Sequence, residues 1–183
     1  MKLYPHFYWA IGVIFLASCT SLESSSTSQS HNNQVNSSQQ VVTLDQNFQI
    51  AMGQTIYVPI YSHIYHENQQ KILNLAATLS IRNTDLNKSI IITSVRYYDS
   101  NGKLVKQYLD RPIQLNSLAS TDFFISRTDI NGGLGANFIV EWIAQTEVSE
   151  PIVEAVMIAT ESQQGVSFVS PGKVIKNQPN NQS

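Results

Sequence analysis

Apolar and polar residues alternate with a period of two along most of the chain between residues 48 and 176. The clearest run covers residues 73–81, where Leu, Ala and Ile positions are separated by Asn, Ala, Thr and Ser. This period is typical of β-strands, because successive strand side chains point to opposite faces of a sheet. Similar short runs lie at residues 90–98, 103–108, 123–127, 137–144 and 152–159.

Turn-forming residues separate these runs. Asn101-Gly102 lies between residues 90–98 and 103–108, and Asn-Gly is a strong hairpin signal because both residues tolerate positive φ. We therefore expect these two runs to pair. About seven short strands without a long helical pattern predict an all-β fold, an antiparallel β-sandwich of immunoglobulin-like arrangement. A partly open β-barrel is the alternative.

The first 19 residues have the pattern of a bacterial lipoprotein signal. A short region containing Lys2 precedes an apolar stretch of about eleven residues, which is too short to span a bilayer. Leu16-Ala17-Ser18-Cys19 then resembles a lipobox, whose cysteine receives a diacylglyceryl thioether and fatty acyl chains such as palmitate. Residues 1–18 are thus predicted to be a signal peptide, and Cys19 to be the lipidated N-terminus.

Composition divides the rest of the chain into three parts. Residues 19–47 are rich in Ser, Gln and Asn, which predicts a disordered tether because such a segment buries little apolar surface. Residues 48–176 are rich in β-branched and aromatic residues and form the predicted sandwich domain. Residues 177–183 are a polar tail, predicted to be disordered.

Charge and cysteine content limit the partner classes. The chain has a formal net charge of −2 and no long basic run, so it lacks the electrostatic signature of a nucleic-acid-binding protein. Its single cysteine cannot form an internal disulfide, which agrees with a lipidation role. We expect a protein anchored to the cell membrane or outer membrane, facing the periplasm or the exterior.

Residues 56–65 are the most informative candidate for a binding site. If they form one strand, Ile56, Val58, Ile60 and Ile64 line one face, while the other face presents Tyr57, Pro59, Tyr61, His63 and Tyr65. Pro59 lacks an N–H, which predicts a sheet edge or a bulge. Tyrosine rings with accessible hydroxyls suit a glycan or protein partner, so Tyr57, Tyr61, His63 and Tyr65 are the candidate binding face. The alternative is that the tyrosines pack within the domain.

Three further patterns in the sequence bear on metal binding or catalysis. His63 and His66 would lie on opposite faces of a strand, which disfavours chelation. The glycine-rich residues 128–137 suggest a phosphate or calcium loop, but they precede a strand and do not match an EF-hand, so a turn is the simpler interpretation. Asp99, Glu141 and Glu154 could serve a hydrolase only if two of them face each other across a sugar. No metal, cofactor or catalytic residue is assigned, and we expect a protein that is not an enzyme.

Several segments also resemble one known family. These are residues 53–62, 79–85, 97–99 and 133–142, which are similar to the bacterial family called domain of unknown function 3124. The resemblance covers nearly all of residues 53–170 and suggests a bacterial source such as a cyanobacterium, but implies no activity. The favoured hypothesis is a lipid-anchored binding module of the cell envelope, with an envelope-polymer hydrolase and a structural spacer as alternatives.

Overall fold

The computed structural model describes residues 39–45, 47–160 and 165–178. The predicted signal peptide, Cys19 and most of the predicted tether lie outside these residues, as do the last five residues of the predicted tail. All described residues belong to the compact unit that covers residues 35–183.

The described part of the chain consists of β-strands joined by turns and loops. Its strands are β1 (Gln39–Val41), β2 (Met52–Pro59), β3 (His63–His66), β4 (Asn68–Asn74), β5 (Ala76–Arg82), β6 (Ile90–Tyr98), β7 (Leu104–Gln107), β8 (Ile113–Leu115), β9 (Ser120–Ile125), β10 (Asn137–Ala144), β11 (Ile152–Ala159), β12 (Val166–Pro171) and β13 (Lys173–Asn177).

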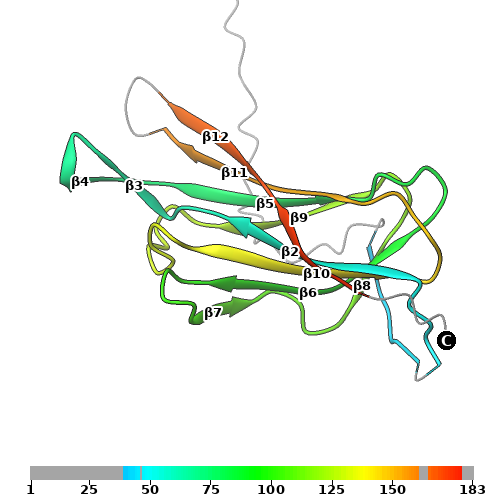
Figure 1. The fold of residues 1–183 in the computed structure, drawn as a ribbon. Helices are drawn as coiled ribbons and strands as arrows, with labels where there is room; N and C mark the ends of the chain where they lie inside the picture. Colours follow the sequence, from blue (N-terminus) through cyan, green and yellow to red (C-terminus); the bar gives the residue numbers. More distant parts are fainter. Residues whose placement is uncertain (1–38, 46, 161–164, 179–183) are drawn as a thin grey trace, which may run out of the picture. The chain divides into compact units, whose positions relative to one another are not determined.

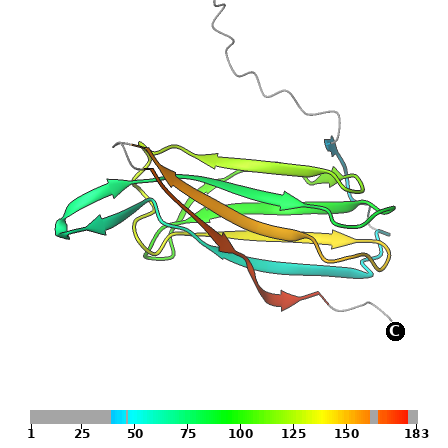
Figure 2. The ribbon, with the colours of Figure 1, turned by 90° about the horizontal axis from the view of Figure 1, so that it is seen from above.

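These strands form two antiparallel sheets and a separate hairpin (Figure 1). The seven-stranded sheet has the order β1-β8-β6-β10-β2-β13, with β7 also paired to β6, and the four-stranded sheet has the order β12-β11-β5-β9. Strands β3 and β4 pair only with each other and extend beyond the sheets at one end (Figure 2). The structure confirms the predicted antiparallel β-sandwich, and the chain passes repeatedly between the sheets, as in immunoglobulin-like domains.

The core lies between the two sheets and follows the predicted alternation. In β5 every second residue is buried, and the buried set includes Leu79 and Ile81. Trp142, Tyr97 and Phe138 are the largest fully buried side chains. Burial raises the pKa of Tyr97 to about 12, because the charged phenolate would lose its hydration in the core.

The hairpin predicted from Asn101-Gly102 is confirmed. Strand β6 pairs with β7, and Gly102 has a φ of 76°, a left-handed conformation that glycine adopts without a steric penalty. Asp99 fixes the same turn, because its Oδ1 accepts hydrogen bonds from the backbone amides of Asn101 and Lys103.

The folded part begins earlier than the predicted boundary at residue 48. Strand β1 lies within the predicted tether, where it pairs with β8 at the edge of the seven-stranded sheet. The Val42 amide continues this contact by donating to the carbonyl oxygen of Pro112. Three paired residues were too few to stand out from their polar neighbours in the sequence. At the other end β13 includes Asn177, one residue past the predicted end.

Residues 56–65 do not form one strand, which corrects the prediction. Strand β2 ends at Pro59 and β3 begins at His63. Strand β2 also lies between β10 and β13 rather than at an edge, but β13 pairs with it only as far as Tyr57. Pro59 is therefore beyond the last residue that needs an N–H for that ladder, which explains how a proline is accommodated.

Candidate interaction face

The four residues of the predicted binding face occupy three separate places. Tyr57 lies on the outer face of the seven-stranded sheet, opposite Ile139 of β10. Tyr61 lies in the loop that joins β2 to β3, and its ring centroid is 6.0 Å from that of Phe168 in β12. His63 and Tyr65 lie on β3, with ring centroids 6.1 Å apart. Only the last two come together, so the predicted continuous tyrosine face is wrong.

The chain turns away from the direction of β2 near Ser62, which is buried and held by several hydrogen bonds. Its amide donates to the carbonyl oxygen of Gly133 at 3.1 Å, and its own carbonyl accepts from the Leu75 amide at 2.9 Å. Its Oγ accepts from the Gly133 amide at 2.9 Å and shares a hydrogen bond with His63 Nδ1. These partners are distant in sequence, apart from His63, so the break could not be seen in the alternation pattern.

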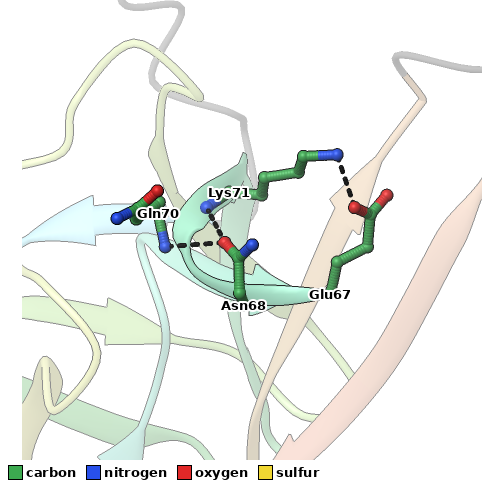
Figure 3. Close-up of polar contacts among 4 residues, drawn as sticks. All are labelled: Glu67, Asn68, Gln70 and Lys71. Carbon is green, nitrogen blue, oxygen red and sulfur yellow. Dashed lines mark hydrogen bonds and ion pairs between the residues drawn. The ribbon is translucent and has the colours of Figure 1, made fainter.

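The tip of the β3–β4 hairpin is held by local hydrogen bonds (Figure 3). Asn68 Oδ1 accepts from the backbone amides of Gln70 and Lys71, at 3.0 and 3.1 Å. Glu67 adopts a left-handed conformation with φ of 61°, and its carboxylate forms an ion pair with the Lys71 ammonium. An Asx turn of this kind orders the tip before any partner binds.

The two faces of the hairpin differ in their surroundings. Ile64 and Leu73, which are paired across the strands, pack against the core of the sandwich. On the opposite face Tyr65 is paired with Ile72, and these side chains are 44% and 51% exposed. The hairpin thus presents an aromatic and an aliphatic side chain to solvent.

This exposed face continues onto the four-stranded sheet. Strand β4 runs almost directly into β5, and the alternation is unbroken, so Ile72 and Thr78 lie on the same side. Thr78 is opposite Val156 of β11 and Phe124 of β9, and Val156 is in turn opposite Val169 of β12. A row of four side chains therefore crosses the outside of the sheet.

Two of these four side chains are strongly exposed. Phe124 is 57% exposed and Val169 is 56% exposed, and the neighbouring Ile158 is 43% exposed. We define the apolar face by the six residues Tyr65, Ile72, Phe124, Val156, Ile158 and Val169. Several exposed apolar side chains on one face of a domain are typical of an interaction site.

One signal in the sequence could have indicated this face. Strand β11 reads Ile-Val-Glu-Ala-Val-Met-Ile-Ala, which is almost continuously apolar rather than alternating. Such a run is typical of a strand with apolar residues on both of its faces. Here one face packs in the core, through Val153 and Met157, and the other supplies Val156 and Ile158.

The glycine-rich residues 128–137 form a turn in which two glycine amides have side-chain partners. The Gly133 amide donates to Ser62 Oγ, and the Gly135 amide donates to Ser100 Oγ at 2.8 Å. The loop carboxylate, Asp129, accepts from the Asn131 side-chain and backbone nitrogen atoms. The donors that a phosphate would need are thus engaged by serine hydroxyls, which agrees with a structural turn.

The acidic residues considered for hydrolysis are not brought together. Glu141 lies on the seven-stranded sheet, and its Oε1 accepts a hydrogen bond from Arg96 Nη2 at 2.6 Å. Glu154 lies on the four-stranded sheet, 4.0 Å from Arg82 Nε, and Asp99 holds the β6–β7 turn. Glu141 and Glu154 point to opposite outer faces of the sandwich, so they do not form a facing pair.

The histidines also remain apart from any cluster of metal ligands. A bulge between Tyr65 and His66 interrupts the ladder, and His66 is exposed near the hairpin tip. Among the residues that the structure describes, no three His, Cys, Asp or Glu side chains come close enough to hold a metal ion. In the same part of the chain, no helix has the length and hydropathy needed to cross a membrane.

These observations define a β-sandwich domain with a projecting hairpin and an apolar outer face. The chain belongs to the family described as "Protein of unknown function (DUF3124)", which matches residues 53–175. The resemblance stated from the sequence is therefore confirmed. The search of curated proteins gives no significant match. Among solved structures, the chain is similar to the crystal structure of Thermotoga maritima 1070, with a TM-score of 0.40 and 8% identity over 66% of this chain and 92% of that one.

Proposed function

We propose that this protein is a lipid-anchored module of the bacterial cell envelope that binds a protein partner through the apolar face. The single observation that carries this proposal is the number of exposed apolar side chains on one side of the domain, on the β3–β4 hairpin and on the four-stranded sheet. Tyr65, Ile72, Phe124, Ile158 and Val169 all exceed 40% exposure on this one side.

A protein partner fits this surface better than a glycan does. The face is mostly aliphatic, and removing aliphatic surface from water is favourable without requiring hydrogen-bond donors, by about 25 cal/mol per Å² before the entropic costs of association. The ordered hairpin tip reduces the entropy lost on binding. A spacer without a binding role would have no evident need for exposed side chains in this pattern. A hydrolase finds no support in the separated positions of Glu141 and Glu154.

The face can be tested by photo-crosslinking in the source organism. A photoreactive residue at Phe124 or Ile72 should form an adduct with a second protein, while the same residue at Leu86 should not. Leu86 is a matched control because it is apolar and 71% exposed but lies in the β5–β6 loop. The double change Ile158→Thr and Val169→Thr should weaken the adduct at Phe124 at least about tenfold, since interface cores contribute most of the binding energy.

Threonine keeps the β-branched shape, so the double variant should retain its fold, with each change altering stability by about 0.5 kcal/mol or less. The proposal is wrong if adducts form equally at Phe124 and Leu86, or if none forms at either Phe124 or Ile72. An adduct between two copies of this chain would also contradict it, because the partner would then be the protein itself.

The membrane anchor is tested separately at Cys19. The change Cys19→Ala should abolish incorporation of a fatty-acid probe and leave an unprocessed or membrane-released species, since stable attachment needs more than one acyl chain or a spanning helix. Ser18→Ala is the matched control, because it keeps a small residue before the cysteine and should leave labelling intact. Equal labelling of the Cys19→Ala variant and the wild type would contradict the anchor.

A further inference from the structure

The outer face of the seven-stranded sheet carries a different chemistry from that of the apolar face. Strand register places Lys173 of β13 opposite Tyr57 of β2, Tyr57 opposite Ile139 of β10, and Ile139 opposite Arg96 of β6. These four side chains form one row across four neighbouring strands, because directly paired residues share a face. Tyr98, two residues beyond Arg96, lies in the next row.

Positive charge exceeds negative charge on this face. Lys176 is opposite Thr55, which is in turn opposite Glu141, the acidic residue of these rows. Glu141 is already engaged by Arg96 at 2.6 Å. Within the described residues no carboxylate lies within 4.0 Å of the ammonium group of Lys173 or Lys176. The two lysines therefore give a local positive charge to a chain whose net charge is −2.

Two tyrosine rings lie on the same face, and both are partly exposed. Arg96 lies over the ring of Tyr98, 6.0 Å from its centroid, which helps to fix that ring in place. In the described part of the chain neither Tyr57 nor Tyr98 makes a hydrogen bond through its hydroxyl, whereas Tyr108 donates to the carbonyl oxygen of Phe124 at 3.0 Å. The hydroxyls of Tyr57 and Tyr98 are thus available to a ligand.

We infer that this basic face, defined by Tyr57, Arg96, Tyr98, Lys173 and Lys176, binds an acidic polysaccharide. The C–H faces of sugar rings pack on tyrosine rings, sugar hydroxyls bond to the phenol oxygens, and sugar carboxylates pair with the lysines. The row spans three strand spacings, about 14 Å. An extended ligand can therefore contact Lys173 at one end and Tyr98 at the other. The basic and apolar faces lie on opposite sides of the sandwich, so this inference does not depend on the proposed protein partner.

The experiment measures retention of the full-length protein, purified in detergent, on three immobilised carboxylated polymers: polygalacturonate, alginate and hyaluronate. Dextran serves as the neutral control. Wild-type protein should bind at least one carboxylated polymer and not dextran, and binding should weaken as salt is raised. The double variant Lys173→Gln, Lys176→Gln should bind about tenfold more weakly, as expected for the loss of two surface ion pairs.

Two further variants distinguish a specific binding site from nonspecific ion exchange. Tyr57→Ala should also weaken binding about tenfold, because it removes one of the two rings on which sugars pack. The matched control Lys71→Gln, Arg111→Gln removes the same charge from exposed residues outside the basic face and should leave binding unchanged. Circular dichroism of each variant confirms that its fold is retained.

Four binding results would overturn the inference, and so would one displacement result. These are failure to bind any of the three carboxylated polymers, equal retention on dextran, equal loss in the Lys71→Gln, Arg111→Gln control, or no effect of Tyr57→Ala. Displacement by glycerol phosphate as effective as displacement by oligogalacturonate would also overturn it. That outcome would show a general anion surface suited to phospholipid headgroups rather than to sugars.

Discussion

Replacing Trp142 with alanine is expected to lower the free energy of unfolding by about 3–5 kcal/mol. The indole is fully buried between the two sheets, where it lies opposite Gln54 of β2 and Ile92 of β6. Its removal leaves a large apolar cavity that the rigid ladders on both sides cannot close. The measurement is urea denaturation followed by circular dichroism, because the substitution removes the fluorescent side chain itself.

The change Trp142→Phe is the matched control and should cost less than roughly half as much. Among the described residues the indole Nε1 has no hydrogen-bond partner, although it is buried, so phenylalanine removes an unsatisfied donor along with some volume. Equal losses for Trp142→Phe and Trp142→Ala would contradict this. The Nε1–H would then have an acceptor, for which Gln54 Oε1 is the candidate, because it is buried and unpartnered and lies on the residue opposite Trp142.

The central strands of the sandwich could be predicted because their information is local. Residues 73–81 alternate, and the structure buries Leu75, Ala77, Leu79 and Ile81 in the core. The Asn101-Gly102 turn likewise needs only its own residues and Asp99 to join β6 to β7. Where period and turn chemistry agree, a strand and its hairpin partner follow from the sequence.

The candidate site could be predicted only in part, because it depends on contacts between distant segments. The sequence indicates Tyr65, but Ile72, which pairs with it, and the row from Val169 to Phe124 come from other strands. The interruption of the strand within residues 56–65 depends on the hydrogen bond between Ser62 and Gly133, which are 71 residues apart in the sequence. Alternation assigns side chains to a face of a strand, but it does not show which strands become neighbours.

The passage of the chain from β12 to β13 is a second feature that alternation could not show. Strand β12 pairs with β11 in the four-stranded sheet, and β13 pairs with β2 in the seven-stranded sheet, so the chain changes sheets at Gly172 (the orange and red ribbons in Figure 1). The Gly172 amide donates to the carbonyl oxygen of Val153 at 2.8 Å. Gly172 thus lies where the edges of both sheets meet.

The change Gly172→Ala is therefore expected to lower the free energy of unfolding by about 1–3 kcal/mol, as overpacking does in other cores. A Cβ at this position would lie 2.6 Å from Ile56 Cγ2 and 2.7 Å from the Val153 carbonyl oxygen, which is backbone and cannot rotate away. Amide hydrogen exchange should also accelerate in β13, because the strand is released when the crossing is displaced. The control Gly165→Ala places its Cβ at an ordinary 3.5 Å from the nearest atom, the Ala159 carbonyl oxygen, and should change stability by about 0.5 kcal/mol or less. If urea denaturation gives the same loss for both variants, the close approach at Gly172 is not what holds β12 and β13 in their two sheets.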